Sequence, residues 1–173
     1  MRAQDLSINF SALGKNKMCM DYSSHIVGMT RSALETLFRT ARATPEDKLT
    51  WKPNPDVRSI LEVLQDAAQR SLMFAAVMKG EARLFTTEMF PVMAQERAQW
   101  TSLEQCEAKA REGLEAFYEV LLATDDFDSV LTMPFGGHQL SKANFSLMPL
   151  QSLTYMNGQV NYIQTLYGDY DRH

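Results

Sequence analysis

Four stretches of the sequence repeat apolar residues at steps of three and four, which places these residues on one face of a helix. The stretches cover about residues 24–42, 56–79, 101–121 and 146–167. Four amphipathic helices without long sheet-forming runs predict an all-α chain, and their simplest packing is a four-helix bundle. With 173 residues in total, we expect one bundle domain over residues 21–173, preceded by a tail or arm over residues 1–20.

Residues that begin or end helices support these boundaries. Ser59 and Glu62 have the spacing of a capping box, in which each side chain satisfies a free backbone N–H group. Gly80 and Gly168 are natural helix stops. Pro149 fits only the first turn of the last helix, because a proline further along would break the hydrogen-bond ladder.

Two segments between the helices are not regular helices. Residues 81–100 predict a loop with short helical pieces, and this length predicts one long crossover in the bundle. Residues 130–135 have strand character, and Gly136-Gly137 is a hairpin turn signal. We therefore expect a small β-hairpin before the last helix.

Charge and cysteine content narrow the classes of function. The net charge of −4 argues against binding nucleic acid or an anionic membrane surface, which usually requires a basic patch. No apolar run approaches the ~20 residues of a membrane span. The two cysteines, Cys19 and Cys106, suggest neither a disulfide framework nor a metal motif, so we predict a cytoplasmic protein with reduced thiols.

Several short motifs, taken in their order along the chain, resemble the DinB superfamily of bacterial four-helix bundles. They are Trp51-Lys52-Pro53 before a capped helix, Met133-Pro134-Phe135-Gly136-Gly137 after the third helix, and Gly158-Gln159-Val160-Asn161-Tyr162-Ile163 in the last helix. The resemblance covers roughly residues 22–170. It implies a bundle that usually dimerises and, in many members, a divalent metal bound by three histidines. Some members are thiol-dependent transferases or isomerases.

The sequence departs from this family at the implied metal ligands. Aligned on the second-helix cap and on the glycine–glutamine pair of the last helix, the three histidine positions hold Asp66, Ser152 and Met156. A carboxylate, a hydroxyl and a thioether form a mixed set that suits neither Zn²⁺ nor Ni²⁺. The resemblance therefore implies a divergent member that has lost its metal site and binds no metal.

We expect the vacated site to be a small, partly apolar cleft that binds a small ligand or partner. Asp66, Ser152 and Met156 would border it, with Tyr155 and Gln159 nearby. The 11 methionines fit this view, because flexible thioether side chains fill irregular space in a core or in an adaptable pocket. Those expected on or near inner faces are Met29, Met73, Met78, Met133, Met148 and Met156.

Two other functions stay open, and catalysis itself is undecided. One alternative is a metal- or thiol-dependent transferase or hydrolase with a rebuilt cation site, for Ni or Zn, around Asp66. This alternative stays open because a carboxylate near a core needs a partner. The second alternative is a dimeric interaction protein with a vestigial pocket. Phe85, Phe90, Trp100 and several tyrosines are left over for a surface, so we expect a homodimer.

The remaining reactive residues give weak signals. His25, His138 and His173 have no metal-binding spacing, and we expect His138 to be an exposed turn residue near the mouth of the pocket. Cys106 lies on the apolar stripe of the third helix, where a cysteine behaves as a small core residue. Cys19 lies in the tail and is expected to be an exposed bystander thiol.

Overall fold

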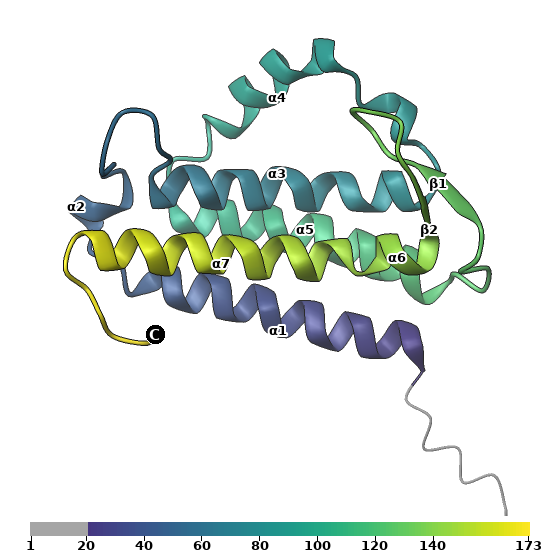
Figure 1. Cartoon of the computed structure of the whole chain (residues 1–173), viewed down its shortest axis with the longest axis horizontal. Helices are drawn as coiled ribbons and strands as arrows, with labels where there is room; N and C mark the ends of the chain where they lie inside the picture. Colours follow the sequence, from purple (N-terminus) through teal and green to yellow (C-terminus); the bar gives the residue numbers. More distant parts are fainter. Residues whose placement is uncertain (1–20) are drawn as a thin grey trace, which may run out of the picture.

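Four long helices dominate the structure, a computed structural model that describes residues 21–173. They are α1 (Tyr22–Arg42), α3 (Ile60–Met78), α5 (Leu103–Leu122) and α7 (Met148–Leu166), and they lie along the long axis of the molecule (Figure 1). The all-α prediction is confirmed. The predicted tail over residues 1–20, with Cys19, lies outside the described residues. None of the described helices has the length and hydropathy that crossing a membrane requires.

The two neighbours α3 and α5 run in the same direction. Gly113 of α5 lies against Ser71 of α3, and the next turns bring the rings of Phe74 and Phe117 to a centroid distance of 6.1 Å. The chain must therefore return along the length of α3 before α5 can begin. Because α3 has 19 residues, this return covers about 28 Å.

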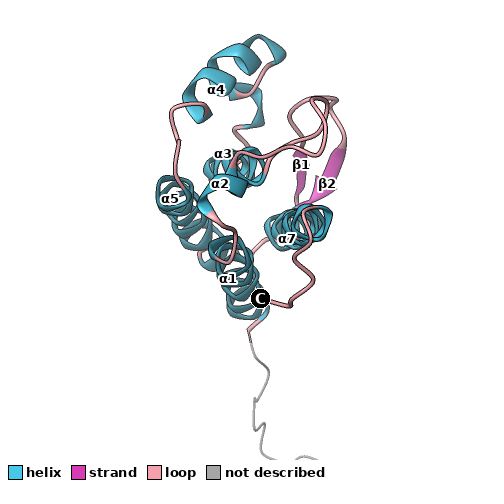
Figure 2. Cartoon of the chain, turned by 90° about the vertical axis from the view of Figure 1, so that its left-hand side faces the viewer, coloured by secondary structure: helices cyan, strands magenta, loops and turns pink. Residues whose placement is uncertain are grey.

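The return segment, residues 79–102, forms an arch over the outer side of α3. It contains two short 3₁₀ turns, η2 (Ala82–Leu84) and η3 (Thr87–Met89), and the helix α4 (Phe90–Arg97). Short helical pieces were predicted here, and they are confirmed. The long connection was also predicted at this place, and its length follows from the shared direction of α3 and α5, which pack against each other. Figure 2 shows α4 standing apart from the long helices.

The second long connection carries the predicted hairpin from α5 to α7. Strand β1 (Val130–Thr132) pairs antiparallel with β2 (Gln139–Ser141), and Leu131 lies opposite Leu140. Positive φ angles at Gly136 and Gly137 explain the glycine pair in the turn. Two short helices that the sequence analysis did not predict are α2 (Glu46–Leu49) and α6 (Lys142–Ser146).

Side chains at the helix starts set the boundaries. The capping box of Ser59 and Glu62 is present, and α3 begins at the next residue, Ile60. The predicted start near Asp56 is therefore wrong, because the Asn54 side chain accepts a hydrogen bond from the Asp56 amide and holds a turn there. Pro149 lies in the first turn of α7, as predicted.

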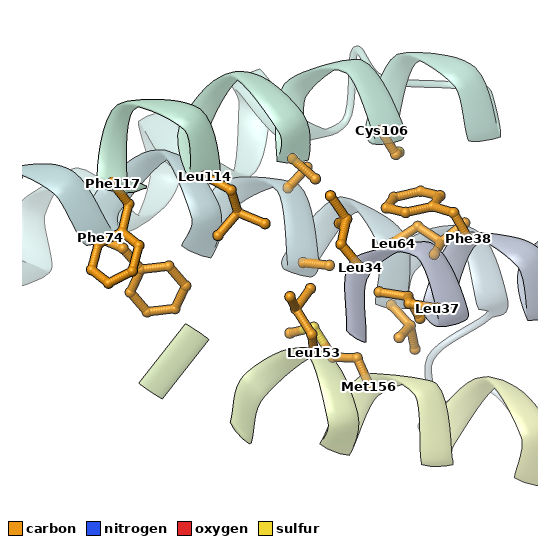
Figure 3. Close-up of a cluster of buried hydrophobic side chains, with 14 of the residues drawn as sticks. Leu34, Leu37, Phe38, Leu64, Phe74, Cys106, Leu114, Phe117, Leu153 and Met156 are labelled. Atoms are coloured by element: carbon orange, nitrogen blue, oxygen red, sulfur yellow. The ribbon is translucent and has the colours of Figure 1, made fainter. Parts of the chain in front are cut away.

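The core lies between the four long helices. In Figure 3, leucines and Phe38 of α1 meet Leu64 of α3 and side chains of α7. The predicted inner faces of α3 and α5 are buried throughout, including Cys106. Two expectations are wrong: Met29 is exposed, and Trp100, assigned to a surface, packs into the hydrophobic core, where Gln65 of α3 donates a hydrogen bond to its carbonyl.

The contact at Gly113 gives a test of the helix packing. A Cβ atom there would overlap the backbone of Ser71 and Leu72, so Gly113→Ala should lower the free energy of unfolding by about 1–3 kcal/mol. Gly158→Ala is the matched control, because a Cβ meets nothing there and alanine favours the helix by about 0.5–1 kcal/mol. Urea unfolding followed by circular dichroism measures both changes. Equal effects of the two variants would contradict the close contact.

Candidate functional site

A cavity of about 880 Å³ lies beside α3 on the side covered by the arch and the hairpin. Its volume falls within the range of roughly 300–1,000 Å³ that is typical of small-molecule sites. Most of its wall is apolar and consists of Met73, Phe74, Val77, Phe90, Pro91, Met93, Ala94, Met133, Pro134, Phe135, Leu140, Phe145 and Met148. The polar side chains of the wall are Asp66, Gln69, Arg70, Arg97, His138 and Ser152.

The polarity of the wall changes along α3. Asp66, Gln69 and Arg70 line the cavity near the start of this helix, and Met73 and Val77 line it one and two turns later. All five follow the spacing of one helix face. Helix α4 runs back along α3 in the opposite direction, and it begins with an aromatic residue and ends with a polar one. The two helices therefore place their polar residues at the same end of the cavity. The cavity is therefore polar at one end and apolar at the hairpin end.

Aromatic side chains close the apolar end. The rings of Phe90 on α4 and Phe135 in the hairpin turn lie with their centroids 4.6 Å apart. Both side chains are partly exposed. Opposite them, the buried ring of Phe145 lies 6.1 Å from that of Phe74, in an edge-to-face arrangement. The apolar end is thus covered by partly exposed rings on one side and rests on core rings on the other.

The polar end is organised around the carboxylate of Asp66. Its Oδ2 accepts hydrogen bonds from Arg58 at 2.8 Å and from Arg70 at 3.1 Å, and its Oδ1 lies 3.8 Å from Arg97. The Asp66 side chain is only 12% exposed. A carboxylate so buried needs ionic or hydrogen-bonding partners, and three arginines supply them. Asp66 thus holds together the approach to α3, α3 itself and the end of α4.

Arg58 extends this cluster to α7. Its Nη2 donates to Oε1 of Gln159 at 2.7 Å, and Nε2 of Gln159 donates to the hydroxyl of Tyr155 at 3.1 Å. Asp66, Gln159 and Tyr155, which were predicted to lie near one site, are therefore connected through an arginine that the sequence analysis did not single out. The Arg58 side chain lies between Asp66 and Gln159, because the loop before α3 passes the end of α7.

The structure brings the predicted site residues together only in part. Asp66 and Ser152 line the cavity. Met156 is 1% exposed and points into the core in Figure 3, while Tyr155 is 65% exposed. Of the described residues, Met156, Tyr155 and Gln159 do not line this cavity. The cavity that Asp66 and Ser152 share extends from α3 towards α4 and the hairpin.

The residues at the metal positions implied by the resemblance do not fit a divalent metal. Three guanidinium groups surround Asp66, so a cation would meet their charge before it met the carboxylate. The Sδ atom of Met156 lies in the core, 4.0 Å from the Ser152 hydroxyl. Within residues 21–173, no three His, Cys, Asp or Glu side chains gather as a metal site would require.

The histidines lie apart from this polar end. His138 is exposed and lines the hairpin side of the cavity, which agrees with its predicted place near the mouth. His25 is exposed on α1. His173 lies 3.0 Å from the Asp169 carboxylate near the chain end.

Gln69 is a polar residue of the cavity wall that the sequence analysis did not identify as a site residue. It is 5% exposed, and its Oε1 is buried without a hydrogen-bond partner among the described residues. An unpaired buried carbonyl is costly unless something binds it. No sequence signal could have found it, because a glutamine on an apolar helix face is indistinguishable from a paired core residue.

The thiol of Cys106 has a purely structural environment. It is fully buried on α5, with Sγ 3.8 Å from the carbonyl oxygen of Trp100. Burial, with a smaller contribution from the charge of Glu104, raises the pKa of Cys106 to about 12. A thiol with so little thiolate is a poor nucleophile.

No protein-family model matches the sequence, and no curated protein matches it either. The function must therefore be argued from the chemistry of the cavity.

The Cys106 environment predicts an inert thiol. In a Cys19→Ser variant, Cys106 is the single cysteine, and iodoacetamide should alkylate it roughly 100-fold more slowly in the folded chain than in guanidinium. The reason is the combined effect of burial and a raised pKa. Mass spectrometry over time measures both rates. Similar rates in the two conditions would show that the Cys106 thiol is accessible and reactive in the folded chain, which would contradict this prediction.

Proposed function

We propose that this protein binds an apolar small molecule in the cavity beside α3. The observation that carries the proposal is a cavity of about 880 Å³ with a mostly apolar wall, in which methionine and phenylalanine are the commonest residues. Apolar pockets with few polar groups are the usual form of small-molecule sites. The methionines add adaptability, because their unbranched side chains repack around ligands of different shape.

The proposal is one of binding without catalysis. The ionisable side chains in the wall are Asp66, Arg70, Arg97 and His138. Asp66 is engaged by guanidinium groups, and arginine does not act as a general base. His138 lines the hairpin side, away from the polar end. These positions support a site that recognises a ligand, and they provide no paired acid and base.

We also propose that the chain is a divergent DinB-like four-helix bundle whose metal site has been lost. The support is the order of four long helices, the hairpin before the last of them, and the placement of Asp66 and Ser152 on one cavity. The core position of Met156 marks how far the chain has diverged.

Two further predictions concern partners and location. The net charge of −4 supports a protein without a nucleic-acid or membrane partner. The free thiol of Cys106 suits a reducing compartment, and a cytoplasmic location stays a prediction.

A neutral fluorescent probe tests the cavity directly. N-phenylnaphthylamine should bind and gain fluorescence, because the cavity removes its apolar surface from water. Ala94→Trp places an indole in the cavity and should weaken this binding at least roughly tenfold, since about 1.4 kcal/mol of lost contact is tenfold in affinity. Fluorescence titration measures both affinities.

Ala108→Trp is the matched control for this experiment. Ala108 is exposed on α5 and does not line the cavity, so its replacement should leave probe binding unchanged. Loss of binding in both variants, or in neither, would contradict the cavity as the binding site.

A second candidate function, an interaction through α7, has its own observation. Tyr155 and Tyr162 are 65% and 66% exposed and lie seven residues apart, on one helix face. Exposed aromatic residues in a row are typical of protein interfaces. This supports the homodimer that the sequence predicts from leftover aromatic residues, although Trp100, one of those residues, is buried.

The double variant Tyr155→Ser/Tyr162→Ser tests the dimer. Light scattering of the unaltered chain should give about twice its mass of 19.7 kDa, and the variant should give the monomer mass, because the exposed aromatic surface is removed. Replacing the exposed Tyr170 instead provides the control. A monomer already present in the unaltered chain at micromolar concentration would contradict this candidate.

A further inference from the structure

We propose that the ligand of this cavity is an amphipathic anion, with a carboxylate or phosphate monoester head held by Arg70 and Arg97 and an apolar tail that points to the hairpin end. This inference rests on the proposed function and adds the chemical class of the ligand. It follows from charge, from unused hydrogen-bond donors, from one unpaired buried atom and from the length of the apolar wall.

The polar end carries an excess of positive charge. Three arginines surround the single carboxylate of Asp66, which leaves two positive charges without an opposite partner in that cluster. The nearby Glu62 does not balance them, because Lys52 donates to it at 2.7 Å. The side chains of Arg70 and Arg97 are 55% and 41% exposed, so an anion can reach them. An anionic head would complete the charge balance.

The donors that remain free belong to the two arginines of the cavity wall. Arg58 uses Nη1 on Asp66 and Nη2 on Gln159, and it does not line the cavity. The Arg70 side chain uses only Nε, and the Arg97 side chain makes no hydrogen bond with residues 21–173. Guanidinium groups bind carboxylate and phosphate with paired, charge-assisted hydrogen bonds. The free donors thus match the proposed head in number and type.

Gln69 is an independent sign of a ligand. It lies between Asp66 and Arg70 in the sequence of α3 and lines the cavity, and its Oε1 is buried without a partner among the described residues. Its amide can accept from a ligand donor or, after rotation, donate to an anionic oxygen. A ligand with a polar head at this end removes the cost of the unpaired amide, whereas a wholly apolar ligand does not.

The tail has a wall of suitable length. From Asp66 to Val77 the helix advances eleven residues, which is about 16 Å. Beyond the head, the wall along this distance is Met73, Phe74 and Val77, and Phe145 closes its inner side. An alkyl chain of about ten carbons can bury its apolar surface along this wall. Polar head and apolar tail therefore have separate places.

Competition against N-phenylnaphthylamine tests the inference with three ligands of equal tail length: decanoate, decyl phosphate and decanol. Both anions should bind at least roughly tenfold more tightly than decanol, because only they gain charge-assisted bonds to the arginines. The two anionic arms distinguish a carboxylate from a phosphate head.

Two variants should change this preference in opposite directions. Arg97→Gln removes a donor and should weaken anion binding roughly tenfold. Asp66→Asn removes the carboxylate that competes for the same guanidinium groups and should strengthen it. Decanol affinity should not change in either variant, which a general loss of structure would not produce. Arg39→Gln on α1 changes the net charge equally, lies outside the cavity and should change nothing.

The possible results separate the two proposals. Decanol binding as tightly as both anions, or an unchanged preference in Arg97→Gln, would overturn the anionic head and leave the apolar site standing. Displacement of the probe by none of the three ligands would overturn the proposed function itself. If Asp66→Asn does not fold, Arg97→Gln and its Arg39→Gln control decide the question alone.

Discussion

Helices α3 and α5 touch backbone to backbone at Ser71 and Gly113 and run in the same direction. A close, parallel pair cannot be joined by a short turn, because the chain must return over about 28 Å before the second helix begins. The return segment carries α4 over the free side of α3 (Figures 1 and 2). One wall of the cavity is therefore a consequence of helix direction, and the small side chain at position 113 is what permits the contact.

Local signals in the sequence predicted most of this architecture. The capping box at Ser59 and Glu62 and the proline in the first turn of α7 are short-range features, and both are present. Helix direction is not a local property, so the sequence predicted a long crossover at this place but not that it joins two parallel helices in contact. Met29 shows the same limit: its spacing placed it on the inner face of α1, but the face that is buried depends on where α7 and α5 lie.

The candidate site was less accessible to sequence reasoning. Asp66 was identified because a carboxylate near a core needs a partner, and the partner expected was a cation. The pairing with Arg70 could have been read from their four-residue spacing on one helix, but Arg58 and Arg97 arrive from other segments. Gln69 gave no signal at all. The sequence positions of the expected site residues indicated one wall of the cavity. The other wall comes from α4 and the hairpin, and only the tertiary structure shows that these segments lie there.

Helix α4, which lines the cavity, is held loosely by the rest of the chain. Helix α4 has no buried residue of its own, and it is fixed at its two ends, by Phe90 against Phe135 and by Arg97 near Asp66. An apolar tail would cover the exposed rings at one end, and an anionic head would engage the guanidinium group at the other. Both contacts stabilise α4 in place, because they use surface that the chain alone leaves in water. The side chains that fix the two ends of α4 are thus the same ones that would contact the ligand.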